Sequence, residues 1–205
     1  MTRAEARTAI QASFETVAGA PTTAELNVWI DLEHKNFRRE LADAVPSLYE
    51  STTAEQTLTT ADDVFELPAD FETLVRFERK YGTTWQPVEV ADGLMPQLGD
   101  LSFLETGATL KVGPNVLAPG TYRAVYIAQP ATLSAESGTG GVLLVPAGCE
   151  DVILERVAAR CRIKLEEDPS PHTGRAAAVW REQKRALRKR YGRHPVPGLR
   201  VVRGW

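Results

Sequence analysis

Cysteine and histidine are the residue types in this chain that can act as nucleophiles or hold a metal ion. The chain has two cysteines and three histidines, namely Cys149, Cys161, His34, His172 and His194. A structural zinc site needs four such ligands in closely spaced pairs, and these residues lie too far apart in sequence to supply them. A nucleophilic cysteine needs a neighbour that stabilises its thiolate, and no motif marks one. The spacing therefore predicts no metal site, no cofactor and no catalytic residue.

Two short motifs also fail to supply a catalytic set. The stretch SGTGGV at 137–142 is glycine-rich, but no Lys-Ser or Lys-Thr pair follows it, as a phosphate-binding loop requires. Asp62 and Asp63 are adjacent, and adjacent residues of a strand point to opposite faces, so they predict a turn better than an acid–base pair. A binding or structural role is favoured, and a small hydrolase without a recognisable nucleophile stays an alternative.

The same cysteines and histidines fit structural roles. His34 lies in an apolar helical stripe between Ile30 and Phe37, which predicts a hydrogen-bonded or boundary side chain. Cys161 falls in another such stripe and is expected in the core. Cys149 comes twelve residues earlier, out of helical phase, so the two thiols cannot pair if both are helical.

Charge is distributed unevenly along the chain, whose net charge is −3. Residues 156–205 carry 14 basic and 4 acidic residues, whereas residues 1–155 carry 10 and 23. Such asymmetry indicates an electrostatic partner, which is another copy's acidic body, an acidic protein or nucleic acid. A solvated basic helix without a partner is the alternative.

The basic residues are concentrated in a predicted helix whose cap is Ser170, whose first residue is Pro171, and which ends before Gly192. Its predicted basic face consists of Arg181, Lys184, Arg185, Arg188 and Lys189. This face suits phosphate contacts, and a nucleic-acid-binding module is the second hypothesis for function. Trp180 and Tyr191 fall on the apolar face, where they are expected to pack in the core and not to stack on bases.

The last thirteen residues, 193–205, are too apolar for a purely solvated terminus. They span up to about 40 Å when extended, and their prolines reduce the entropy lost on docking. Such a segment suits a partner's sheet edge or groove, and a tail folded back on its own subunit is the alternative. The predicted docking residues are Arg193, Pro195, Pro197, Leu199, Arg200, Val201, Val202, Arg203 and Trp205.

The elements expected at the two ends are helices. Thr2 with Glu5 and Thr22 with Glu25 match the capping-box spacing. They predict helices over 3–18 and 23–45, and helix returns at about 149.

Between these helices the pattern changes to short runs rich in Thr and Val. Strands are predicted at 56–60, 63–67, 72–81, 86–90, 102–105, 108–113 and 121–128. In the third run, Thr73, Val75 and Phe77 are expected on one face, with Arg76 and Glu78 on the other. Asp70 is expected to bond amides in the turn after Pro68.

The resulting fold class is α+β: a helical bundle with an inserted antiparallel β-rich domain and an extended carboxyl-terminal arm. The predicted domains are 1–50, 51–145, 146–192 and 193–205, of which the first and third form the bundle. No segment resembles a secretory signal or a membrane span, so a soluble protein made in a reducing compartment is expected.

Several stretches resemble the head-to-tail connector (adaptor) proteins of tailed bacteriophages. They are ELPADFETLVRFE, GTTWQPVEV, GTYRAVYIAQPATL and VLLVPAGCEDVILERVAARCRIKLEEDP, and the resemblance covers roughly residues 22–190. VPSLY at 45–49 matches a further stretch of that family loosely, with Ser47 where tryptophan is common.

This resemblance implies a non-enzymatic virion protein, made in the bacterial cytoplasm. Such proteins form a ring, usually of twelve copies, that joins the portal to the next tail or neck protein and lets packaged DNA pass without specific binding. It also implies that an arm, here 193–205, docks onto the portal, and that loops such as 92–100 face the next tail protein. The basic and acidic parts of the chain suit the two different sides of a head-to-tail interface.

Overall fold

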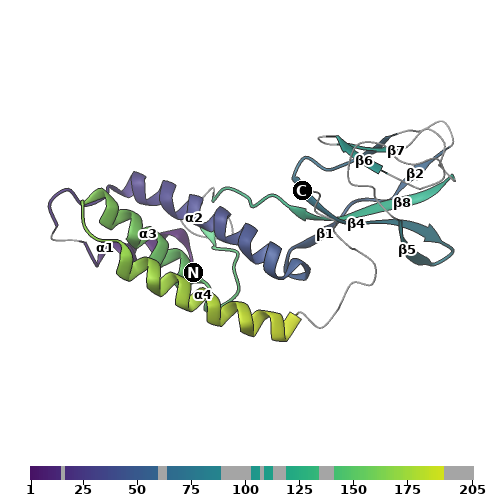
Figure 1. Ribbon diagram of the computed structural model, residues 1–205. Helices are drawn as coiled ribbons and strands as arrows, with labels where there is room; N and C mark the ends of the chain where they lie inside the picture. Colours follow the sequence, from purple (N-terminus) through teal and green to yellow (C-terminus); the bar gives the residue numbers. More distant parts are fainter. Residues whose placement is uncertain are drawn as a thin grey trace. The chain divides into compact units, whose positions relative to one another are not determined.

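The computed structural model describes residues 1–14, 17–59, 64–88, 103–106, 109–112, 119–133 and 141–191, with the backbone alone at 103–106 and 109–112. These residues form two compact units, drawn in Figure 1. The helical unit comprises Met1–Val45 and the chain from Pro130 onward through the last helix, and the β unit comprises Pro46–Gln129. The α+β class is confirmed, while the four predicted domain ranges stay a prediction.

Four helices build the helical unit within the described residues. They are α1 (Arg3–Gln11), α2 (Thr23–Ala44), α3 (Glu150–Lys164) and α4 (Ser170–Tyr191). Both predicted capping boxes are present, since the Thr2 and Thr22 hydroxyls accept from the amides of Glu5 and Glu25, whose carboxylates bond back.

Helix α1 ends at Gln11, earlier than the predicted residue 18. The amides of Ser13 and Phe14 donate to carbonyls three residues back, which tightens the chain into turns. Phe14 is thereby buried, and the Arg162 guanidinium lies 5.1 Å from its ring centre.

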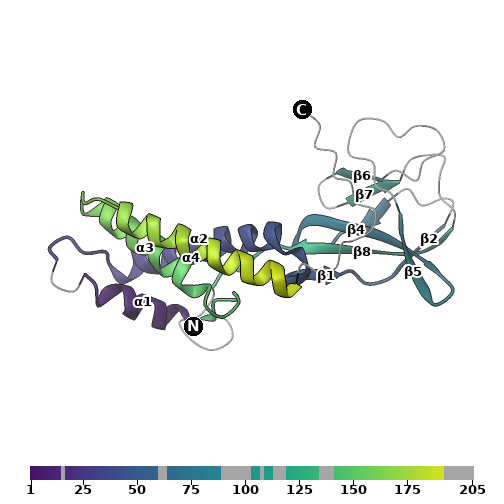
Figure 2. The ribbon, with the colours of Figure 1, turned by 60° about the horizontal axis from the view of Figure 1, so that its bottom comes forward.

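Helix α3 is the centre of the bundle. It lies beside both α2 and α4, as Figures 1 and 2 show. Its buried residues point in almost every direction around its axis; they are Val152, Ile153, Val157, Ala158, Ala159 and Cys161. Ion pairs join Arg156 to Glu40 and Lys164 to Glu25, so α2 and α3 run antiparallel.

A short segment before α3 is bonded to Met1, which lies just ahead of α1, and to α2. The Leu143 amide donates to the Met1 carbonyl at 2.9 Å, and the Leu144 amide donates to His34 Nε2 at 3.2 Å. His34 is fully buried, so the predicted hydrogen-bonded role is confirmed. Because Nε2 accepts, the neutral ring carries its proton on Nδ1.

The β unit contains an antiparallel sheet with strand order β1-β8-β4-β5, in which β2 also pairs with β8. Its strands are β1 (Glu50–Thr52), β2 (Gln56–Leu58), β4 (Phe71–Tyr81), β5 (Thr84–Val88) and β8 (Gly120–Ala128). A second sheet has the order β3-β7-β6, from Val64–Glu66, Thr109–Val112 and Phe103–Thr106. All seven predicted strands are found, with shifts at their ends, and β1 was not predicted.

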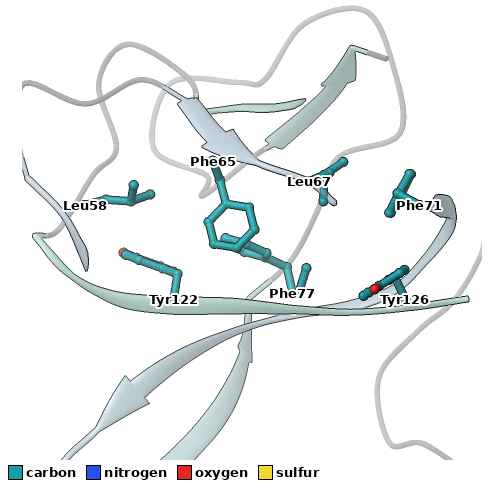
Figure 3. Packing of buried hydrophobic residues seen from close by; sticks show 8 residues of the cluster. Leu58, Phe65, Leu67, Phe71, Phe77, Tyr122 and Tyr126 are labelled. Carbon is teal, nitrogen blue, oxygen red and sulfur yellow. The ribbon is translucent and has the colours of Figure 1, made fainter. Parts of the chain in front are cut away.

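Aromatic side chains pack between β3 and the larger sheet. The Phe65 ring meets Phe77 edge-on at 4.9 Å, and Phe77 stacks on Tyr122 at 5.4 Å (Figure 3). Tyr126 lies on the same face, and its hydroxyl donates to Asp70 Oδ1 at 3.1 Å. The Asp70 carboxylate thus accepts from a tyrosine hydroxyl, where amides of the turn were expected.

The predicted faces of β4 are wrong in part because the strand has two irregularities. Its register against β8 shifts between Phe71 and Thr73 and again between Leu74 and Arg76, as β-bulges do. Leu74 and Phe77 therefore lie opposite Tyr126 and Ala124 on the core face.

Thr73 pairs with Ile127 and shares the other face with Arg76, while Val75 is the extra residue between them. Glu78 is on that face as expected, where it accepts from Arg76 and Arg123 at 2.7 and 2.6 Å.

Glu166, just after α3, has a left-handed backbone conformation that is strained for a residue with a side chain. Its φ is 58°, and the amides of Glu166 and Glu167 donate to Ile163 and Arg162, which is the Schellman pattern where glycine is usual. Replacing Glu166 by Gly should raise the free energy of unfolding by about 1 kcal/mol, because strain at Cβ is removed. Urea denaturation measures it. Glu166→Ala removes the charge and keeps the strain, so an equal gain in that variant would contradict the explanation.

His34 makes stability depend on pH. Burial lowers the pKa of His34 from 6.5 to about 4. The positive charges of Arg38 and Lys35 also lower it, while the negative charge of Asp31 acts in the opposite direction. The unfolded chain takes up this proton near pH 6.5 and the folded chain near pH 4. Stability is therefore full above this window and falls by about 3 kcal/mol as the pH drops through it.

The measurement is urea unfolding at several pH values, compared with a His34→Gln variant that cannot titrate. The difference in stability between the two proteins should shrink as the pH falls. A difference that is constant from neutral to acid pH would rule out this role of His34.

Candidate docking surface on the last helix

Helix α4 starts beside a carboxylate that caps it. Asp168 Oδ1 accepts from the amide and the hydroxyl of Ser170 at 2.9 and 2.6 Å, and these bonds lower the Asp168 pKa. Ser170, predicted as a possible cap, is the first helical residue. Two residues on, His172 Nδ1 lies 2.6 Å from the Glu155 carboxylate of α3. The start of α4 is therefore held in place by two carboxylates that the sequence analysis did not single out.

The inner face of α4 packs on α2 through Trp180. Its ring meets the Phe37 ring edge-on, with centres 5.0 Å apart and planes at 82°. Ala176 and Leu187 are buried on the same face, one turn or two away. Trp180 is half-buried in this contact, so its predicted packing role is confirmed.

The outer face of α4 carries the predicted cations. Arg181, Arg185, Arg188 and Lys189 are exposed, and within the described residues none of the four makes an ion pair. Lys184 differs, because it is half-buried and its Nζ lies 5.5 Å from the Trp180 ring centre. Residues 170–191 contain seven basic residues and one acidic residue, so this helix presents a positive surface.

The other predicted docking residues lie outside the described residues. These are the arm positions Arg193, Pro195, Pro197, Leu199, Arg200, Val201, Val202, Arg203 and Trp205, with the loop 92–100. For all of them, docking stays a prediction.

The two thiols lack the features of a nucleophile. Cys149 and Cys161 are free and buried, and burial raises the pKa of each to about 11. Each is therefore a neutral thiol near pH 7. Over the described ranges, no three of the His, Cys, Asp and Glu side chains are placed to hold a metal ion, and no helix has the length and apolar character to cross a membrane.

Comparison with known proteins places the chain in a family. Residues 1–201 match the model of the SU10 adaptor protein, which is nearly the whole chain. The chain belongs to the SU10 adaptor family. A search of curated proteins found no match. The match agrees with the resemblance to phage adaptors and extends further toward both ends than the stretches that carried it. This SU10 adaptor family member is accordingly a phage structural protein, and its expected location is the virion.

Trp180 is expected to hold α4 to the bundle. Trp180→Ala should lower the free energy of unfolding by about 3 kcal/mol, because it removes a half-buried aromatic contact with Phe37. Arg181→Ala, one residue along on the exposed face, should change it by less than about 0.5 kcal/mol. Both values come from urea titrations followed by tryptophan fluorescence and circular dichroism. Equal losses in the two variants would show that the Phe37 contact does not anchor the helix.

Proposed function

We propose that this adaptor forms a ring that joins the portal to the tail and extends the DNA channel. The observation that carries the proposal is the family match over residues 1–201. The ring has about twelve copies, as the resemblance to connector proteins implies, and the protein has no catalytic role. Its partners are the portal, the next tail or neck protein, and neighbouring copies of itself.

The arm, residues 193–205, is the segment that docks onto the portal. It follows directly after α4, which ends at Tyr191, so the helix gives the arm a fixed point of departure. Leu199, Val201, Val202 and Trp205 supply apolar contacts, and the arginines add attraction to an acidic surface. Because two prolines limit the free arm's conformations, docking costs less entropy.

Charge also suits passage of DNA through the ring. Residues 1–155 carry 23 acidic and 10 basic residues, a net charge of −13. A channel with this sign of charge repels phosphates, so packaged DNA slides without sticking.

A nucleic-acid-binding module is the second candidate, supported by the exposed cations of α4. Phosphate contacts need no aromatic platform, but binding single strands usually adds one. The Trp180 ring packs against Phe37, and the Arg190 guanidinium lies 5.3 Å from the ring centre of the half-buried Tyr191. Neither aromatic ring of the helix is therefore an open platform for a base. This function therefore ranks below the ring.

Removing residues 193–205 should leave a folded protein that no longer binds the portal. Its thermal unfolding midpoint and circular dichroism should stay close to those of the full chain. Binding is measured by mixing each protein with portal protein from the same phage and separating the mixture by size. A control that keeps the arm but replaces Arg200 and Arg203 by Gln separates charge from apolar contact. Portal binding by the truncated protein at the strength of the full chain would contradict the role of the arm.

A further inference from the structure

The exposed cations of α4 stand close together along one face of the helix. Arg181, Arg185 and Lys189 are spaced four residues apart, so their side chains are neighbours on the surface. Like charges at this spacing destabilise a helix by a few tenths of a kcal/mol for each pair. Among the described residues, the single acidic residue of the helix, Glu182, forms no ion pair with any of them.

The helix dipole accounts for only part of this charge. Basic residues in the last turn, Arg188 to Arg190, interact favourably with the negative end of the helix. Arg185 and Arg181 lie six and ten residues before Tyr191, beyond the last turn, where the dipole has little effect. Folding of the chain therefore gives no reason for these two arginines, although both are held at the surface by the anchored inner face.

Small residues, most of them in the turns before Arg181, leave room for close approach. Ala177, Ala178 and Ala186 are exposed on the same helix, as is Gly174. A partner's backbone can come near such a surface while the arginine and lysine side chains reach around it.

We infer that this basic outer face of α4, defined by Arg181, Arg185, Arg188 and Lys189, is the surface on which each copy of the chain contacts the acidic β unit of the next copy. The inference rests on the proposed ring and names the side of the subunit that closes it. In sequence, residues 46–129 have 12 acidic and 5 basic residues, a net charge of −7 that complements the basic face, and a head-to-tail contact joins two different surfaces. Duplex DNA is disfavoured because the whole chain has a net charge of −3.

The test removes Arg181 and Arg185 together as Arg181→Gln and Arg185→Gln, which keeps two good helix formers. The control is Lys35→Gln with Lys164→Gln, which removes the same charge from cations of the helical unit that pair with Asp31 and Glu25. Each protein is titrated onto portal protein, and the number of bound copies per particle is counted by mass photometry. Wild-type and control proteins should fill the ring cooperatively.

The double arginine variant should bind single copies with unchanged affinity but lose cooperativity, with full occupancy needing about tenfold more protein. Cooperative filling by this variant would overturn the inference, while the ring itself would stand. Weaker binding of single copies would instead assign the face to the portal, which also overturns it. A wild-type protein that forms no ring would refute the proposed function itself.

A parallel measurement addresses nucleic acid. Binding of each protein to a short duplex DNA is followed by fluorescence anisotropy at low and high salt. Weak binding that is equal in the three proteins supports the contact between copies. Binding that depends steeply on salt and is lost only in the double arginine variant, with ring filling intact, would assign the face to DNA.

Discussion

The contacts of Phe37 hold the three long helices of the bundle together. The side chain is fully buried on α2, where the Trp180 ring of α4 meets it edge-on and the Arg156 guanidinium of α3 lies 5.4 Å from its centre. Arg156 also pairs with Glu40 at 2.6 Å, so one residue of α3 contacts α2 through both a ring and a carboxylate. A charged group placed over a ring face and bonded to a carboxylate has little freedom to move. The orientation of α4, and with it the direction of its cations, follows from this arrangement.

This arrangement joins segments that are far apart in the sequence. Residues 1–45 and the chain after 130 form one unit, so the β unit is an insertion between its two parts. Further contacts connect the two parts of this unit. Arg160 pairs with Glu33, and Arg3 donates to the Leu133 carbonyl at 2.8 Å. Because Glu33 is buried, its two arginine neighbours compensate a charge that would be costly alone. The helical unit is therefore built from two parts that lie on either side of the β unit in the sequence.

Much of this fold could be predicted from sequence because its signals are local. The capping boxes at Thr2 and Thr22 and the periodic stripes of α2 and α3 depend on residues within a few turns of each other. Strand β1 was missed because Glu50–Thr52 has three residues and no buried position, so it carries no alternation. The inner face of β4 was mispredicted because a bulge inverts the alternation, and pairing with β8 across some fifty residues decides where bulges fall.

The docking surface could be predicted only in part. Residue type and spacing were enough to predict that five cations share one face of α4. They were not enough to show which of the five are exposed and which one contacts another side chain. Lys184 is drawn toward Trp180, and this depends on how α4 packs against α2. The capping role of Asp168 and the pairing of Glu155 with His172 were likewise invisible, since the first lies in a loop and the second joins two helices.

The exposed cations of α4 differ from several cations elsewhere in the described residues, which pair with carboxylates. Arg76 and Arg123 share Glu78, Lys80 has Glu55, and Lys164 has Glu25. Among the described residues, the four cations of the basic outer face of α4 form no ion pair. They stay unpaired although the chain has more acidic than basic residues, 27 against 24. Exposed charges act over about 8 Å at physiological salt, so such a row adds little to folding and much to the rate and selectivity of association. A partner with the opposite charge is therefore the simplest physical account of why this face is left unpaired in a single copy.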